Sequence, residues 1–331
     1  MRIIAAALPA LLTASALAAP AKMQAVVQTA GTDISKLQLQ TVDTPAAAAH
    51  QVLIRVYAAG VNPVDRKRTA TPGANGAAIP GFDVAGVIEG VGPGVTNVKV
   101  GDAVFARANG AYAQYAVANA DGAIAKPKAF TFEQAAGIPV AGVAGYRAVE
   151  AAQVKAGQRV AIIGAAGGAG SAAVDIAKAR GASVVAIGHS SQESFLKSLK
   201  ANEFVAYDKT DVAAQVRDVD AVLNMVDGQA DAGVKYAKRG GRLASIAGPA
   251  SAGACAAAGV SCVQIGPTYR GPTSEADTLR ALAKLADDGQ YIVRVTKSLP
   301  LAEAAGAQQA NLSGETMGKL ILVVDDRAKQ R

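Results

Sequence analysis

The segment that most constrains the fold is a glycine-rich heptapeptide, GAAGGAG, at residues 164–170. An uninterrupted apolar run, RVAII at residues 159–163, comes directly before it, and residues 171–180 continue with a helical pattern. An apolar run without polar alternation is typical of a strand that is covered on both faces. We therefore predict a strand, a tight turn and a helix in this order.

This order of elements is the one that a dinucleotide-binding turn requires. Gly167 would let the backbone approach a pyrophosphate, and Gly170 would let the helix pack against its strand. The N–H groups of the helix N-terminus would then face the phosphates. A turn that serves only for packing is the alternative interpretation. The candidate cofactor-binding residues of the turn are Ala165 (in place of the usual first glycine), Ala166, Gly167, Gly168, Ala169 and Gly170.

Further apolar strands are predicted at residues 183–187, 204–207, 220–226 and 241–247, with helical stretches between them. Strands that alternate with helices form right-handed βαβ units and a parallel sheet. We therefore predict an α/β protein with a Rossmann doubly wound parallel-sheet domain at residues 147–270.

A different pattern precedes this domain. It consists of short strand-like runs broken by Gly and Pro, at residues 24–27, 51–58, 83–91, 104–106 and 112–117. Thr131 and Gln134 then form a capping-box pattern that predicts the start of a helix. The chain ends with a predicted helix at residues 275–288 and a strand at 319–324. The first part, residues 23–146, is therefore expected to be a mostly β domain.

The end of the second Rossmann strand bears on the choice of cofactor. Sites that prefer NAD usually place an acid there for the ribose 2′-hydroxyl. The segment here is Gly188, His189, Ser190 and Ser191, and no acid follows until Glu193. This composition favours NADPH over NADH. A helix N-cap at the two serines is the structural alternative.

Residues 1–22 have the order of an export signal. Arg2 provides a charged start, residues 3–12 are apolar, and residues 14–16 and 16–18 offer small-x-small cleavage sites. The apolar stretch is too short for a comfortable membrane span, so stable membrane insertion is not expected. We expect a signal peptide and a mature protein that is periplasmic or secreted. Translation from Met23 would instead give a cytoplasmic protein.

The two cysteines of the chain, Cys255 and Cys262, would close an eight-residue loop if they were joined. In an oxidising compartment such a disulfide would contribute about 2–3 kcal/mol. Two small buried apolar side chains are the alternative. The two histidines, His50 and His189, lie far from the cysteines and from each other in sequence. The four side chains therefore lack the spacing of zinc ligands, and no metal is expected.

Composition excludes some function classes. With 331 residues, of which 51% are hydrophobic, the chain can form two cored domains. Its net charge is +7, but the basic residues are scattered, with no run longer than residues 66–68. A nucleic-acid partner is therefore not expected, and an anionic cofactor accounts for the mild excess.

From residue 23 to residue 325 the sequence resembles the zinc-independent, zeta-crystallin-like quinone oxidoreductase branch of the medium-chain dehydrogenase/reductases. The motifs that carry this resemblance share the order and spacing of that family. They are AGVNPVD at residues 59–65, PGFDVAGV at 80–87, VGDAVF at 100–105, the turn at 165–170, GGRL at 240–243 and GKLIL at 318–322. Zinc-containing members carry a Cys and a His in the regions of Val61, Asn62 and Phe82, where this chain does not.

The resemblance implies that residues 23–146 are a GroES-like catalytic domain, completed by residues 271–331. It also implies hydride transfer from NADPH to a small molecule, either a quinone or the β-carbon of an α,β-unsaturated carbonyl (an enone), with a proton taken from solvent. Asn62 and Asp65 match motif residues at the reacting end of the site, and they are the candidate catalytic residues. Tyr207 matches a family tyrosine near the adenosine phosphate. A homodimer through the strand near residues 260–265 is likewise implied.

Two residues depart from the family pattern. The family often carries Thr at the position of Ala144, close to the nicotinamide, and Lys near Gln192. Together with the export signal, these departures support an alternative function: an exported, non-catalytic nucleotide-binding or interaction protein that retains the reductase fold. Turn chemistry before Pro63 is the structural alternative for Asn62.

Overall fold

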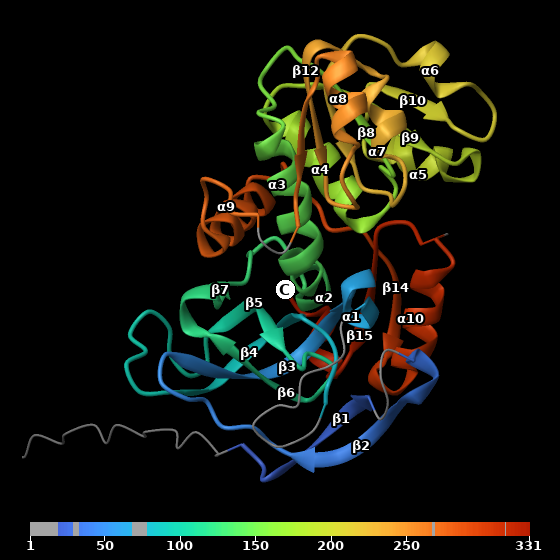
Figure 1. Cartoon of the computed structure of the whole chain (residues 1–331). Helices are drawn as coiled ribbons and strands as arrows, with labels where there is room; N and C mark the ends of the chain where they lie inside the picture. The colour runs from blue at the N-terminus through green and yellow to red at the C-terminus, as the bar shows by residue number, and fades with distance from the viewer. Residues whose placement is uncertain (1–18, 29–32, 68–77, 267–268, 315) are drawn as a thin grey trace, which may run out of the picture.

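Two large sheets organise the chain, which the computed structural model describes for residues 19–28, 33–67, 78–266, 269–314 and 316–331. In Figure 1 a parallel sheet lies in the upper part, and a mainly antiparallel sheet lies below it. The strands are β1 (Lys22–Gln28), β2 (Leu37–Asp43), β3 (Gln51–Val61), β4 (Asp83–Val91), β5 (Ala103–Asn109), β6 (Tyr115–Asn119), β7 (Ile124–Ala125), β8 (Arg159–Ile163), β9 (Ser183–Gly188), β10 (Glu203–Ala206), β11 (Val219–Asn224), β12 (Ala237–Ser245), β13 (Ser261–Gln264), β14 (Val295–Pro300) and β15 (Lys319–Val323).

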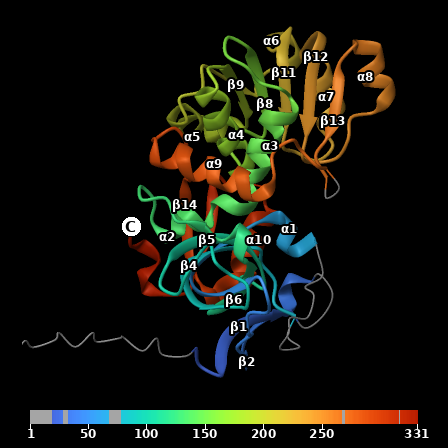
Figure 2. The same cartoon turned by 90° about the vertical axis from the view of Figure 1, so that its left-hand side faces the viewer.

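Helices cover these sheets and connect them (Figure 2). The helices are α1 (Pro63–Lys67), α2 (Phe132–Ala136), α3 (Val143–Ala151), α4 (Gly168–Ala179), α5 (Glu193–Ser198), α6 (Val212–Gln215), α7 (Ala230–Val234), α8 (Ala252–Ala258), α9 (Glu275–Asp287) and α10 (Ala304–Leu312). Short helical turns are η1 (Ile34–Lys36), η2 (Ala120–Gly122), η3 (Ile138–Gly142), η4 (Ser190–Gln192), η5 (Leu301–Glu303) and η6 (Asp326–Lys329).

The parallel sheet has the strand order β10-β9-β8-β11-β12-β13. Successive residues of a strand point to opposite faces, and this alternation divides the core. In β8, Val160 and Ile162 belong to one buried cluster with residues of α4, whereas Ala161 and Ile163 belong to another with residues of α7 and α8. Both faces are covered, as the continuous apolar run predicts. The predicted doubly wound α/β domain is confirmed.

The second sheet has the order β14-β15-β3-β4-β5-β6, and β6 also pairs with β3. Strands β3 to β6 therefore close on themselves as a small barrel. The approach of β4 to β3 is close, because a Cβ on Gly86 would lie 1.9 Å from the carbonyl oxygen of Arg55. This closed, mostly β architecture is the predicted GroES-like domain.

The last strand of the chain is an interior strand of this barrel domain. β15 pairs with β14 on one side and with β3 on the other, and its residues Leu320, Ile321 and Leu322 are buried. The segment after the parallel sheet thus returns to the first domain. This return also brings Gly318 against the glycine-rich turn, since Gly318 forms a β-bridge with Gly167.

Helices α2, α3 and α4 connect the two domains. The predicted capping box begins α2: the Thr131 hydroxyl accepts from the Gln134 backbone N–H, and the Gln134 side chain accepts from the Thr131 backbone N–H. Farther along, α3 packs closely on α4 at Gly145, where a Cβ would lie 2.8 Å from the carbonyl oxygen of Ala169.

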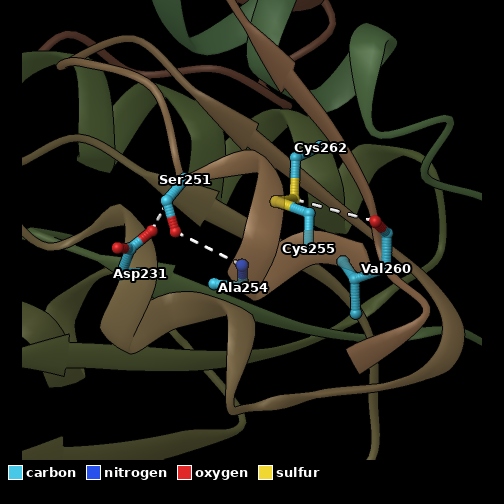
Figure 3. Close-up of a disulfide and its surroundings, with 6 residues drawn as sticks. All are labelled: Asp231, Ser251, Ala254, Cys255, Val260 and Cys262. Carbon is cyan, nitrogen blue, oxygen red and sulfur yellow. Dashed lines mark hydrogen bonds between the residues drawn. A yellow bond between two sulfur atoms is a disulfide. The ribbon is translucent and has the colours of Figure 1, made fainter. Parts of the chain in front are cut away.

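The two cysteines form a disulfide, which settles the alternative left open by the sequence. Cys255 lies in α8 and Cys262 in β13, with their Cα atoms 6.2 Å apart (Figure 3). Ser251 caps the same helix, since its hydroxyl accepts from the Ala254 backbone N–H. The disulfide therefore ties α8 to the edge strand of the parallel sheet.

Some elements of the fold differ from those that the sequence predicts. Strand β14 and helix α10 were not predicted, and β12 begins at Ala237, four residues before its predicted start. Residues 1–18, which contain the predicted cleavage sites, lie outside the described residues. Within the described ranges, no helix has the length and apolar character that a membrane span requires.

Candidate functional site

The glycine-rich turn connects β8 to α4, and each of three glycines has its own geometric reason. Gly164 has φ +76°, and a Cβ there would lie 2.5 Å from a Val226 methyl group. A Cβ on Gly170 would lie 2.1 Å from the carbonyl oxygen of Gly164, so helix α4 can approach its strand only with glycine at this position. This is the packing role predicted for Gly170.

Gly167 differs from these two, because the space beside it is open. A Cβ there would meet one atom within 4 Å, the Gly164 carbonyl oxygen at 3.7 Å. Gly167 is also the N-cap of α4, and no side chain caps the helix. The backbone is thus bare at the helix N-terminus, as the predicted approach of a pyrophosphate requires.

The N-terminus of α4 offers donors to that open space. The Ser171 N–H bonds to the Gly167 carbonyl, which leaves the preceding amides of Gly168, Ala169 and Gly170 without an intrahelical acceptor. Three such amides and the positive end of the helix dipole attract an anion. The residues present therefore fit the pyrophosphate of a dinucleotide.

The two alanines before Gly167 take part through the backbone. Both side chains are buried in the core. The Ala165 N–H donates to the Ile187 carbonyl, and the Ala166 carbonyl accepts from the Gly318 N–H. Ala165 and Ala166 therefore hold the turn between β9 and the start of β15.

The residues predicted for the adenosine end gather after β9. Gly188 is required by packing, because a Cβ there would lie 2.6 Å from a Leu196 methyl group. His189, not either serine, is the N-cap of η4: its Nδ1 accepts from the Ser191 N–H. Tyr207 is 56% exposed, and its ring lies edge-on to that of His189, with the ring centres 5.7 Å apart.

Ser190 has a partner that the sequence interpretation missed. Its backbone N–H and its hydroxyl each donate to the Asp208 carboxylate, both at 2.7 Å. Asp208 follows Tyr207, at the end of β10. The loop after β9 carries no acid before Glu193, but the neighbouring strand brings one to the same place.

At the other end of the turn, Asn62 and Asp65 lie in a buried polar cluster. The Asn62 amide donates to the Asp83 carboxylate at 2.8 Å, and the Asn62 carbonyl oxygen of the side chain accepts from the Lys319 ammonium at 2.6 Å. Lys319 also lies 3.5 Å from Asp83, and both side chains are at most 5% exposed. The Asn62 side chain is thus held by charged partners and is not used for the turn before Pro63.

Asp65 occupies the second half of this cluster. Its Oδ2 accepts from the Asn62 backbone N–H and from the Tyr112 hydroxyl, both at 2.8 Å. Gln308 donates to the Tyr112 oxygen at 2.7 Å. Burial, and next the negative charge of Asp83, raise the pKa of Asp65 from 3.8 to about 7.

A small cavity adjoins these groups, and Asp65, Tyr112 and Gln308 are among the residues that line it. Its volume of about 10 Å³ is of the size that holds one water molecule. The Asp65 Oδ1 and the Gln308 Oε1 are buried and have no partner among the described residues. A water in the cavity would satisfy such acceptors.

Lys319 joins the polar cluster to the cofactor turn. A Cβ on Gly168 would lie 2.9 Å from the Lys319 Cδ, so the side chain passes directly beside the N-terminus of α4. Its ammonium then reaches Asn62 and the carbonyl oxygen of Val61. The predicted catalytic and cofactor-binding residues are therefore brought together by a residue that the sequence interpretation did not select.

The site residues that were not predicted from the sequence differ in whether a sequence motif contains them. Asp83 and Lys319 lie within motifs that support the family resemblance, so a polar residue inside an apolar strand motif could have identified them. Asp208 and Gln308 lie in no such motif. Within the described part of the chain, no three His, Cys, Asp or Glu side chains gather as a metal site.

Comparisons with known proteins agree with this architecture. Residues 48–156 match the alcohol dehydrogenase GroES-like domain, and residues 199–322 match the family described as zinc-binding dehydrogenase. The quinone oxidoreductase of Coxiella burnetii superposes with a TM-score of 0.82 at 28% identity, covering 92% of this chain and 99% of that one.

Two sequence relatives extend the comparison. The chloroplastic NADPH-dependent alkenal/one oxidoreductase of Arabidopsis thaliana is 30% identical over 327 residues, which is 92% of this chain and 80% of the relative. The quinone oxidoreductase of Rattus norvegicus is 33% identical over 216 residues, 61% of this chain and 65% of the relative. The chain therefore belongs to the quinone oxidoreductase branch of the medium-chain dehydrogenase/reductase family, and it is an oxidoreductase.

Proposed function

We propose that this chain reduces quinones or α,β-unsaturated carbonyls by hydride transfer from a reduced nicotinamide dinucleotide. The observation that carries the proposal is the bare N-terminus of α4 at Gly167, placed beside the Lys319–Asn62 contact. The names of the two sequence relatives supply the two substrate classes.

The chain's own residues would bind and orient the reactants. The amides of Gly168, Ala169 and Gly170 would hold the pyrophosphate, and Lys319 would fix the turn relative to Asn62. The nicotinamide supplies the hydride when it is bound. The Asn62 amide nitrogen already donates to Asp83 and to the Gly60 carbonyl oxygen, so we propose that the substrate oxygen takes its proton from solvent. Orientation of the two reactants would then provide most of the acceleration.

We further propose that the reaction uses no metal. Val61, Asn62 and Phe82 stand in the regions where the zinc-containing branch has Cys and His. Treatment with a chelator is expected to leave turnover unchanged, whereas a loss that zinc restores would refute this part of the proposal.

Different observations favour each of the two forms of the cofactor, NADPH and NADH. NADPH is favoured by the absence of an acid in the loop after β9 and by the Arabidopsis relative, which is named an NADPH-dependent oxidoreductase. Asp208 acts against it, because a carboxylate repels a phosphate.

Calorimetric titration of the mature protein with NADPH and NADH, followed by turnover with a quinone and an enal, tests the proposed function. Micromolar binding of one dinucleotide with turnover supports it. Binding without turnover of either substrate class would favour the non-catalytic nucleotide-binding alternative. No binding of either dinucleotide would overturn the oxidoreductase proposal.

We also propose that the protein is exported and forms a homodimer. A disulfide between α8 and β13 suits an oxidising compartment, which supports export by the N-terminal signal. β13 pairs with β12 and is the last strand of the parallel sheet, and such an edge can accept a second copy of the chain. Light scattering of the mature protein is expected to give the mass of a dimer, and the mass of a monomer would contradict this part.

A further inference from the structure

The position of Ser190 in the fold identifies it with the ribose end of the proposed dinucleotide site. β9 is the neighbour of β8 in the parallel sheet, and ligands of such sheets bind beyond the carboxyl ends of the strands. Ser190 follows β9 and comes 20 residues after Gly170. A residue at about this distance from the glycine-rich turn meets the 2′-position of the adenosine ribose in Rossmann sites.

Asp208 reaches this position from the next strand. Ala206, the last residue of β10, pairs with Gly188, the last residue of β9, and the Tyr207 N–H donates to the Gly188 carbonyl. The two strand ends are therefore locked together, and Asp208 lies opposite Ser190. Both hydrogen-bond donors of Ser190 are taken up by its carboxylate.

The Asp208 carboxylate is ionised under ordinary conditions. The hydrogen bond from the Ser190 hydroxyl, assisted by the Ser190 backbone N–H, lowers the pKa of Asp208 from 3.8 to about 2. Its side chain is 18% exposed, so it faces the solvent side of the strand ends and is not sealed in the core.

The surrounding positive charge is modest. The Lys209 ammonium lies 3.5 Å from Asp208, but its side chain is 67% exposed. His189 Nε2 also lies 3.5 Å away, while its Nδ1 accepts from the Ser191 N–H.

These contacts discriminate between the two forms of the cofactor. A 2′-phosphate carries nearly two negative charges, and it would meet an ionised carboxylate and a serine whose donors are occupied. A 2′-hydroxyl can donate to the carboxylate instead. Resting on the proposed function, we infer that Asp208 determines cofactor specificity: it accepts the ribose 2′-hydroxyl of NADH and rejects the 2′-phosphate of NADPH. This inference opposes the sequence-based prediction of NADPH, and the measurement of both dissociation constants decides between them.

Dissociation constants of NADH and NADPH, measured by calorimetry on the mature protein, test this inference. The wild type is expected to bind NADH at least about tenfold more tightly than NADPH. Asp208→Asn retains an oxygen acceptor for Ser190 and removes the charge. It should therefore lower the ratio of the NADPH to the NADH dissociation constant about tenfold, mainly through tighter NADPH binding. Asp208→Ser serves as a second variant, and thermal unfolding confirms that each variant is folded.

Glu193→Gln is the matched control, because Glu193 is an acid in the same loop region and pairs with Lys197 at 2.7 Å rather than with Ser190. Its ratio of dissociation constants should equal that of the wild type. Added salt should narrow the ratio in the wild type and leave it unchanged in Asp208→Asn, since salt screens an exposed charge.

The outcomes separate the inference from the proposed function. Equal or tighter binding of NADPH by the wild type, or an unchanged ratio in Asp208→Asn, would overturn the role of Asp208 while the reductase proposal stands. Failure of both dinucleotides to bind would overturn the proposed function and the inference with it.

Discussion

The Lys319 ammonium lies 2.6 Å from the Asn62 side-chain oxygen, and the stem of the same lysine fills the space beside Gly168. Lys319 starts the last strand of the chain, whereas Asn62 follows β3 and Gly168 begins α4. One side chain thus links the polar cluster of the barrel domain to the turn of the Rossmann domain. A change in either domain can reach the other through this contact.

Replacing Lys319 by Met should destabilise the protein by about 3–5 kcal/mol, because the buried Asp83 carboxylate would lose its cation. Urea unfolding measures the change. Lys22→Met is the control, since the Lys22–Asp43 pair is more than 60% exposed on both sides and should contribute at most about 1 kcal/mol. Similar small losses of unfolding free energy in both variants would show that the buried Lys319–Asp83 pair stabilises the fold no more than an exposed pair.

Asp65 should make stability depend on pH. Burial raises the pKa of Asp65 from 3.8 to about 7, so the folded protein binds more protons than the unfolded chain between these values. The free energy of unfolding must then fall as the pH rises from about 4 to about 7, by at most about 4 kcal/mol. Urea unfolding across this range measures the slope.

Asp65→Asn cannot titrate at this position and should flatten that part of the profile. Glu303→Gln, at an exposed residue of η5, should leave the wild-type slope unchanged. If the slope persists in Asp65→Asn, other titrating groups cause it and the assignment to Asp65 is wrong.

Gly167→Ala should fold normally and bind the dinucleotide at least about tenfold more weakly. The φ of Gly167 is −70° and a Cβ has room there, but that Cβ would stand where the pyrophosphate approaches. Gly306→Ala, in the open part of α10, is the control for a harmless added methyl group. Calorimetry and thermal unfolding together give both readouts, and unchanged affinity in Gly167→Ala would place the phosphates elsewhere.

Removal of the disulfide should lower stability by about 2–3 kcal/mol, because the eight-residue loop between α8 and β13 gains freedom in the unfolded chain. The double variant Cys255→Ser/Cys262→Ser is compared with the wild type by urea unfolding. Dithiothreitol should shift the wild type to the stability of the double variant and leave the double variant itself unaffected. A wild type that is insensitive to a reductant strong enough to open the bond would contradict this expectation.

The mature N-terminus should begin near Ala19 when the full chain is expressed in a bacterium. Residues 14–18 offer small-x-small cleavage sites, and the described fold begins immediately afterwards with β1 at Lys22. Intact-mass spectrometry of the protein from the periplasmic fraction makes the measurement. A chain that begins at Met1 or Met23 would contradict export by this signal.

Local patterns predicted much of the fold. The turn at residues 164–170 and the capping box at Thr131 depend on neighbours within a few positions, so the sequence displays them directly. Strand β14 was missed because half of its sequence, VTKSLP, is polar and most of its residues are exposed. Helix α10 was missed because its buried residues are Ala304, Ala307 and Gln308, which form no strong apolar stripe.

The site was less predictable because its decisive contacts are long-range. Gln308 and Lys319 reach residues near position 62 that are more than 240 positions away in sequence. Asp208 reaches Ser190 across two strands whose register is fixed by the sheet. Residue type and spacing cannot reveal such partners, and only the assembled sheets place them together.

The interior position of β15 has a consequence for the order of folding during synthesis. Until residues 319–323 have left the ribosome, β3 lacks one of its neighbours, and the turn at Gly167 lacks its bridge to Gly318. The whole Rossmann domain is therefore synthesised before the barrel and the cofactor turn can be completed. A premature stop codon at position 318 would remove this strand and leave both the barrel and the cofactor turn incomplete.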